Sequence, residues 1–181
     1  MARINNIVQH RYTAPTTTHL DDETYKKVLP VWVKACLDII LYYQHQDGTW
    51  RIVIGKRRNP PLQNQWWIAG GRLLATDLTL QDGAIRKVSE ELGIKLSRQQ
   101  VPEHSEIINY FHWEEDKSIV LAPAMFVQLT TEQATAAPPV NSPEFSQVQH
   151  IDPRLIANAS SPYNQNLRQI VTQFIESGCI G

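Results

Sequence analysis

The segment from residue 70 to residue 94 constrains this chain more than any other, because it joins a glycine turn to a charged helix. It opens with Gly70-Gly71, and Gly93 stands at its far end. Between them, apolar residues recur at helical spacing: Ala84, Ile85, Val88 and Leu92. A glycine directly after such a stripe commonly ends a helix. The pattern therefore predicts a helix over residues 80–92 that follows a tight glycine turn.

Two adjacent carboxylates, Glu90 and Glu91, lie near the end of this helix. Mg²⁺ takes oxygen ligands and commonly uses one or two carboxylates together with substrate phosphates. The glycine backbone can approach closely enough to add a carbonyl oxygen. The alternative is a solvated helix face that carries the i,i+4 ion pairs Arg86–Glu90 and Lys87–Glu91. Helix composition alone leaves both interpretations open.

The rest of the chain alternates strand and helix patterns. Strands are predicted over residues 31–43, 50–56, 106–113, 119–129 and 145–151, and helices over 21–28 and 163–177. Residues 44–49 predict a hairpin turn, residues 130–143 a loop, and residues 1–19 a flexible arm. These elements predict an α+β layered domain over residues 20–181.

Composition narrows the classes of function. The 181 residues carry 17 Lys and Arg against 18 Asp and Glu, a net charge of -1, so a protein that coats nucleic acid is not expected. The chain has two Cys, Cys36 and Cys179, without a zinc-type or disulfide-type pattern. Neither a membrane span nor a signal peptide is visible, which predicts no membrane partner and a cytoplasmic location.

The glycine turn and the helix resemble the Nudix box. The matching positions are Gly71, Arg86, Val88, Glu90, Glu91, Gly93 and Ile94. Two positions depart from it: Asp77 replaces a Glu in a turn that is one residue longer, and Lys87 replaces the Glu that follows the box Arg. The resemblance implies an α/β/α sandwich with a mixed central sheet and the activity of a Nudix-type hydrolase.

The run from Gly55 to Arg72 is similar to the corresponding run of the GDP-mannose mannosyl hydrolase branch of that family. Cys36 to Ile40 resembles the leucine-aspartate strand of the same branch. This resemblance implies a nucleoside diphosphate derivative as substrate, such as a nucleotide sugar. It also implies attack at the sugar carbon and a homodimer.

The resemblance also implies roles for individual residues. Mg²⁺, or Mn²⁺, is expected at Gly70, Gly71, Glu90, Glu91 and Glu144. Arg57 is expected to stabilise the leaving diphosphate, with Glu90 and Glu144 as the other catalytic residues. The substrate-binding residues are then Asp38, Arg57 and Arg72. The branch has a histidine base at the position of Phe145, which cannot accept a proton.

Three alternatives remain open from the sequence. The fold can serve as a binding module that holds a nucleotide without turning it over, which Lys87 and Phe145 favour. A Nudix hydrolase can instead cleave between phosphates, with Glu90 or Glu144 as base. Asp38, inside an apolar strand, can equally be the structural partner of a neighbouring arginine, Arg57 or Arg58.

Overall fold

The computed structural model describes residues 23, 24, 27, 33–105, 107–113, 118–135 and 142–180. The predicted arm over residues 1–19 lies outside these residues, as does most of the predicted helix over residues 21–28. The division into an arm and one domain therefore stays a prediction.

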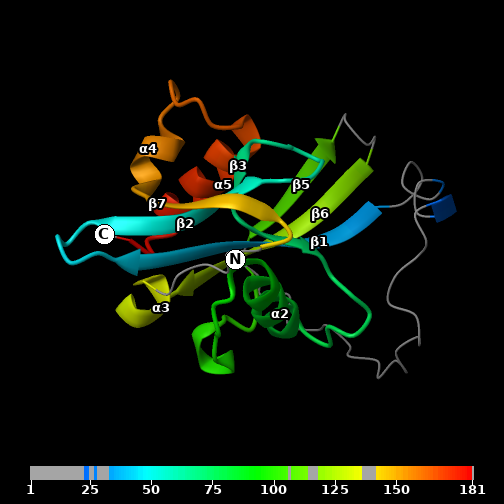
Figure 1. The fold of residues 1–181 in the computed structure, drawn as a ribbon, viewed down its shortest axis with the longest axis horizontal. Coiled ribbons are helices and arrows are strands. Elements are labelled where there is room, and N and C mark those ends of the chain that lie inside the picture. Colours follow the sequence, from blue (N-terminus) through cyan, green and yellow to red (C-terminus); the bar gives the residue numbers. More distant parts are fainter. Residues whose placement is uncertain are drawn as a thin grey trace, which may run out of the picture.

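A mixed seven-stranded sheet forms the centre of the fold (Figure 1). Its main path runs β3-β2-β1-β6-β5, with β4 paired to β1 and β7 paired to β2. The β1–β6 pair is parallel and the other pairs are antiparallel. The strands are β1 (Val33–Gln44), β2 (Trp50–Arg57), β3 (Trp66–Trp67), β4 (Ala69–Arg72), β5 (Ile107–Trp113), β6 (Ser118–Gln128) and β7 (Phe145–Ile151).

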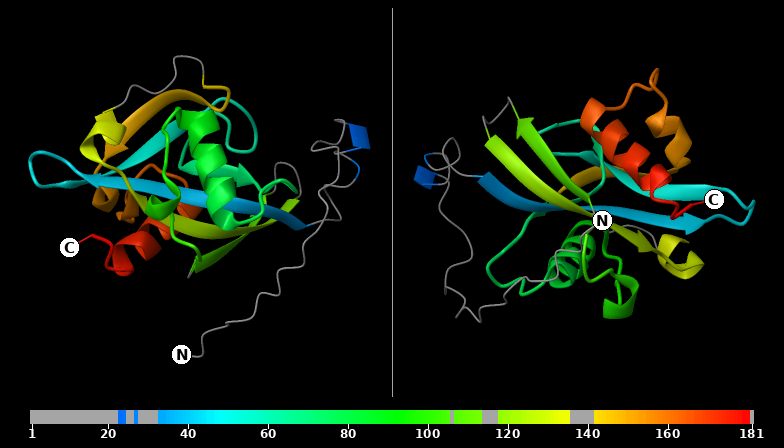
Figure 2. Two further views of the ribbon diagram at one scale, coloured as in Figure 1. Left: turned by 90° about the horizontal axis from the view of Figure 1, so that it is seen from below. Right: turned by 180° about the vertical axis from the view of Figure 1, so that it is seen from behind.

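Helices cover the sheet on both faces. Helix α2 (Leu80–Leu92) lies against one face, and α4 (Pro153–Ala157) and α5 (Gln165–Glu176) lie against the other (Figure 2). A short α3 (Thr131–Thr135) and a 3₁₀ turn, Arg98–Gln100, complete the described elements. The predicted α+β sandwich with a mixed sheet is confirmed.

The side chains of β1 alternate between the two layers of core. Leu37, Ile39 and Leu41 pack with Ala84 and Val88 of α2. Cys36, Ile40 and Tyr42 point the other way and pack with Leu167, Ile170 and Phe174 of α5. This period of two places the even-numbered Asp38 on the α5 side of the sheet.

Helix α2 has the bounds that the sequence predicts. The Thr79 side chain accepts the Asp82 N–H at the start of the helix, and Gly93 ends it in a left-handed conformation with φ of 64°. Both caps are local signals, which explains the agreement. The loop predicted over residues 130–143 is wrong in part, because α3 forms at its start.

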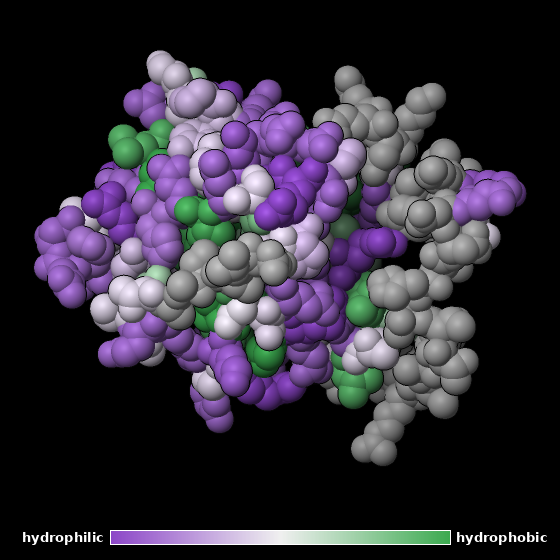
Figure 3. Space-filling view, in the orientation of Figure 1, coloured by the Kyte–Doolittle hydropathy of each residue, from purple (hydrophilic) through white to green (hydrophobic). Residues whose placement is uncertain are grey.

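None of the helices among the described residues is long and apolar enough to cross a membrane. On the face of the molecule seen in Figure 3, hydrophilic residues predominate and hydrophobic residues gather in small patches.

Candidate active site

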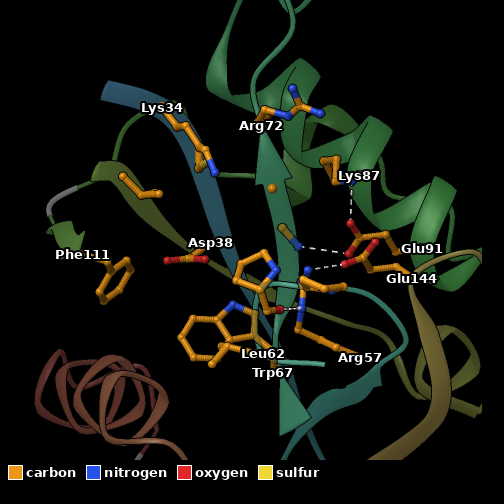
Figure 4. Close-up of a pocket in the computed structure, with 16 residues that line it drawn as sticks. Lys34, Asp38, Arg57, Leu62, Trp67, Arg72, Lys87, Glu91, Phe111 and Glu144 are labelled. Carbon is orange, nitrogen blue, oxygen red and sulfur yellow. Dashed lines mark hydrogen bonds and ion pairs between the residues drawn. The ribbon is translucent and has the colours of Figure 1, made fainter. Parts of the chain in front are cut away.

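A cavity of about 350 Å³ opens between β1, β4, the loop after β2 and helix α2. Its charged lining groups are Lys34, Asp38, Arg57, Arg72, Lys87, Glu91 and Glu144. Cations and carboxylates therefore share one hollow, with Trp67, Leu62 and Phe111 forming an apolar side (Figure 4).

Arg57 lies at the end of β2, where a register shift between Lys56 and Arg57 interrupts the pairing with β7. Such bulges redirect a side chain out of the regular alternation. The guanidinium donates to the Pro61 carbonyl at 2.7 Å and lies 2.6 Å from the Glu144 carboxylate. Arg57 is thus fixed at the cavity wall with Glu144 as its ion-pair partner.

Glu144 is held in place by the turn that precedes β7. The Arg58 backbone N–H donates to the Glu144 carbonyl, and the Arg58 side chain donates to the carbonyls of Ser142 and Phe145. The buried Ser142 hydroxyl donates to the Glu91 carbonyl at 2.7 Å and accepts the Phe145 N–H. These bonds tie the turn to β2 and to α2, so Glu144 and Glu91 share one rigid frame.

Glu91 is almost completely buried at the C-terminal end of α2, with 2% of its side chain exposed. One oxygen, Oε2, accepts the Gly70 N–H at 3.1 Å, and the other, Oε1, lies 2.5 Å from the Lys87 ammonium. Burial raises the pKa of Glu91, which Lys87 and the Gly70 N–H oppose and the nearby Glu144 reinforces. In Figure 4, Glu91 and Glu144 lie side by side, with Lys87 beyond one and Arg57 beyond the other.

Gly70 brings β4 against β1. It pairs directly with Asp38 and has a φ of 156°, and a Cβ at this position would overlap the Leu37 carbonyl oxygen. Only glycine therefore allows the backbone N–H to reach Glu91 from this close position.

Arg86 and Glu90 take structural positions. Arg86 donates twice to Asp77, at 2.8 and 2.6 Å, and once to the Arg72 carbonyl, so it clamps the loop after β4 to α2. Glu90 lies 3.0 Å from Arg86 and 3.8 Å from Lys87 and does not line the cavity. Glu90, which the sequence predicted as a site residue, therefore lies outside the cavity that Glu91 and Glu144 line.

Asp38 lies in the cavity wall with 6% of its surface exposed. Burial raises the pKa of this carboxyl to about 7, against the opposing effects of a hydrogen bond from the Trp67 side chain and of the Arg57 charge. Among the described residues, its Oδ2 has no hydrogen-bond partner. Arg57 pairs with Glu144 and Arg58 with backbone carbonyls, so neither forms the ion pair with Asp38 that the sequence left open.

Phe145 serves the core. Its ring packs directly on Gly55, where a Cβ would overlap the ring, and 3% of the residue is exposed. The residue does not line the cavity. A side chain at this position therefore points into the α2 layer of core and away from the charged groups.

The carboxylates expected to bind Mg²⁺ are all paired with cations of the chain. Glu91 is paired with Lys87, Glu144 with Arg57, and Glu90 with Arg86. Gly70 directs its N–H, not a carbonyl, at Glu91. No group of three or more His, Cys, Asp or Glu side chains is placed to hold a metal among the residues that the structure describes. As they are arranged, these residues do not fit a divalent cation.

The cavity brings together most of the residues that the sequence singled out: Asp38, Arg57, Gly70, Gly71, Arg72, Glu91 and Glu144. Sequence reasoning missed Lys34, which precedes the apolar run of β1, and Ser142, whose role depends on a contact 51 positions away. The alternation of β1, in which Lys34, Cys36 and Asp38 share a face, was the available signal for Lys34.

The family model described as the NUDIX domain matches residues 37–174, which is most of the chain. The chain belongs to the Nudix family. This match confirms the family that the Nudix box predicted. It also confirms the prediction of a Nudix-type hydrolase as a class, without its substrate. The glycine turn, α2 and all of the cavity's lining residues except Lys34 and Cys36 lie within the matched residues.

Solved structures share the fold at low sequence identity. A MutT/nudix family protein from Enterococcus faecalis has a TM-score of 0.62 at 12% identity, over 85% of this chain and 67% of that chain. The NUDIX domain of Shewanella oneidensis NrtR, crystallised with ADP ribose, has a TM-score of 0.59 at 16% identity, over 87% and 99%.

A curated relative matches part of the chain. It is the low-salt glycan biosynthesis protein Agl8 of Haloferax volcanii, 26% identical over 81 residues, which are 45% of this chain. The chain spans about half, 48%, of the length of that relative.

Proposed function

We propose that this Nudix protein hydrolyses a nucleoside diphosphate derivative, a nucleotide sugar, in the cavity between β1, β4 and α2. The observation that carries the proposal is the set of four cations, Lys34, Arg57, Arg72 and Lys87, that lines one hollow of about 350 Å³. The same hollow holds the three carboxylates Asp38, Glu91 and Glu144, so its cations exceed its carboxylates by one, and this excess favours a diphosphate anion. The match to a glycan biosynthesis protein agrees with a sugar as the second half of the substrate.

The reaction proposed is attack of water at the anomeric carbon of the sugar. The bond between this carbon and the diphosphate oxygen breaks, and its electron pair leaves with the diphosphate. Arg57 stabilises the charge that develops there, and Glu144 accepts the proton of the attacking water. Asp38 lines the cavity and has one oxygen without a hydrogen-bond partner among the described residues, and it accepts a hydroxyl of the substrate. The sugar passes through an oxocarbenium-like state, which depends on leaving-group stabilisation as well as on the base.

Cleavage between phosphates is the competing chemistry. Glu144 is the carboxylate that can serve it, since Glu90 does not line the cavity. Attack at phosphorus releases a nucleoside monophosphate and a sugar phosphate, whereas attack at carbon releases a nucleoside diphosphate and free sugar.

A binding module is the second candidate function. The contacts that favour it are the ion pairs of Glu91 and Glu144, which neutralise two of the three cavity carboxylates, and the burial of Phe145 in the core. A domain of this fold has been crystallised with ADP ribose, a molecule with the same diphosphate core as the proposed substrates.

Two finer predictions belong to the same proposal: a homodimer and a cytoplasmic location. The Mg²⁺ or Mn²⁺ requirement that the family resemblance implies does not fit the described site. Because the described carboxylates are paired with Arg57, Arg86 and Lys87, the steps above use the chain's own groups, and the metal is one arm of the test. Ile108, Tyr110 and Leu121 are exposed apolar residues of β5 and β6 and are available to a dimer contact, which sedimentation of the whole chain tests.

The test is a turnover screen over nucleotide sugars, ADP-ribose and nucleoside diphosphates, each with Mg²⁺ and with EDTA. Any substrate that is turned over is then hydrolysed in ¹⁸O-water. Label in the free sugar supports attack at carbon, and label in a phosphate product assigns attack at phosphorus. Binding by calorimetry without turnover across the panel assigns the binding module.

A further inference from the structure

We propose that the Lys87 ammonium is the built-in cation of this cavity and replaces a divalent cation beside Glu91. The identity of the anion that it meets, a diphosphate, rests on the proposed function. The position of the charge rests on the contacts of Lys87 alone.

The ammonium contacts the groups that were expected to hold the metal. It lies 2.5 Å from Glu91 Oε1 and 3.8 Å from Glu90 Oε2. It also lies against Gly71, because a Cβ on that glycine would come within 3.4 Å of the Lys87 nitrogen. Three of the expected ligands, one from β4 and two from α2, therefore surround a cation that the chain itself provides.

Charge balance supports the same assignment. Glu91 and Glu144 face the cavity as two anions, and Lys87 and Arg57 compensate them as two cations. A divalent ion between these carboxylates would meet an ammonium and a guanidinium within a few ångströms, at an unfavourable like-charge separation. In this arrangement the site selects against a free metal ion.

The ammonium remains available to an anion in the cavity. Its side chain is 17% exposed and lines the hollow beside Arg72. An ammonium has three N–H donors, so the ion pair with Glu91 does not exhaust its capacity to bind oxygen atoms. Lysine binds phosphate as a point charge, so Lys87 can hold a phosphate oxygen while it neutralises Glu91. It follows that the cavity can bind a diphosphate without a metal ion.

Lys87→Glu restores the carboxylate of the Nudix box and provides the decisive variant. Lys95→Glu makes the same charge change at an exposed position just beyond α2 and is the matched control. Thermal unfolding of the free proteins is followed in EDTA and with increasing Mn²⁺ or Mg²⁺. We expect unchanged midpoints for the wild type and Lys95→Glu. For Lys87→Glu we expect the midpoint of thermal unfolding to rise by roughly 3–6 °C when the metal concentration is ten times its dissociation constant. An equal metal-dependent rise in the wild type would overturn the proposal.

Lys87→Gln and Lys87→Arg test the anion without depending on the fold of the glutamate variant. Calorimetry with GDP, ADP and inorganic pyrophosphate is run in EDTA. We expect Lys87→Gln to bind at least about tenfold more weakly than the wild type and Lys87→Arg to keep most of the affinity. Equal affinities of Lys87→Gln and the wild type would also overturn the proposal.

The two proposals fail in different ways. The metal titration of the free protein uses no nucleotide, so its outcome is independent of the substrate. Turnover of a nucleotide sugar with Mg²⁺ alone, and none in EDTA, would support the proposed function and overturn the role of Lys87. Absence of turnover, with metal binding restored only in Lys87→Glu, would remove the proposed function and support the role of Lys87.

Discussion

The Lys87 ammonium lies 2.5 Å from a Glu91 carboxylate that is 2% exposed, one helical turn away on α2. The sequence left open a solvated helix face with the pairs Arg86–Glu90 and Lys87–Glu91, and both pairs form. The second pair is not on a solvated face, because β4 and the Ser142 turn cover Glu91. Its energetics are therefore those of a buried ion pair.

Removing one partner of such a pair leaves an uncompensated buried charge. We expect Lys87→Met to lower the free energy of unfolding by roughly 3–5 kcal/mol at neutral pH. The double variant Lys87→Met with Glu91→Gln should recover part of this loss, because no charge is then left in the core. Urea unfolding of the single and double variants measures both effects. Lys95→Met, on the surface, should stay within about 0.5 kcal/mol of the wild type, and an equal loss there would contradict the prediction.

A second prediction concerns the clamp between Asp77 and Arg86. Burial opposes ionisation of Asp77, but two hydrogen bonds from Arg86 and one from the Leu74 N–H outweigh it and lower its pKa. A lowered pKa in the folded state adds stability above the ordinary carboxyl pKa, and that stability is lost as the pH falls through the folded value. Asp77→Asn should therefore cost about 1–3 kcal/mol at pH 7, and this difference should shrink below about pH 4.

Urea unfolding of the wild type and Asp77→Asn at a series of pH values measures this difference. Arg86→Lys is the companion variant, since it keeps the charge and loses the two-point geometry. A difference between wild type and Asp77→Asn that is the same at pH 7 and pH 3 would show that the ionised form of Asp77 is not what stabilises the loop.

Local signals explain the parts of the fold that the sequence predicted. Helix α2 has a cap at each end, Thr79 and Gly93, and an apolar stripe between them. The two-residue β3 and the four-residue β4 were missed, because their strand character depends on partners far away in the chain, such as the pairing of Gly70 with Asp38. Glycine has a low strand propensity, so a Gly-Gly pair does not predict a strand.

The site divides in the same way. Glu91, Lys87 and the glycine turn belong to one continuous segment, and the sequence correctly predicted that they lie close together. The burial of Glu91 and the separation of Glu90 from the cavity depend on β4 and on the turn at Ser142, which pack against α2 from elsewhere in the chain. Residue spacing on a helix determines which side chains are neighbours on its surface. It does not determine how deeply a side chain is buried by the rest of the chain.

The position of Phe145 leads to a third prediction. Phe145→His introduces the residue type that the mannosyl hydrolase branch uses as a base, but it places the ring on Gly55 in the core. We expect no gain in turnover, because the ring does not reach the cavity, and a loss of roughly 1–3 kcal/mol in unfolding free energy from the buried polar group. Phe145→Leu, which stays apolar, is the control. A faster reaction in Phe145→His would place this position within reach of the substrate.

Asp38 sets the pH dependence of stability near neutrality. Burial raises the pKa of its carboxyl from 3.8 to about 7 in the folded protein. The folded state therefore holds a proton that the unfolded state releases between these values. A raised carboxyl pKa contributes stability that is complete below about pH 4 and is lost as the pH rises toward 7. The loss approaches about 1.4 kcal/mol for each pH unit, and at most about 4 kcal/mol in total.

Asp38→Asn should remove this dependence, because the amide does not titrate. We expect the variant to gain stability relative to the wild type steadily between pH 4 and pH 7, and the difference to level off above that range. Urea unfolding at each pH gives the difference directly. Asp47→Asn is the control: the hydrogen bonds from Thr49 lower the pKa of Asp47, so its difference from the wild type should be constant across the same range. A constant difference for Asp38→Asn as well would mean that Asp38 is ionised in the folded protein at pH 4.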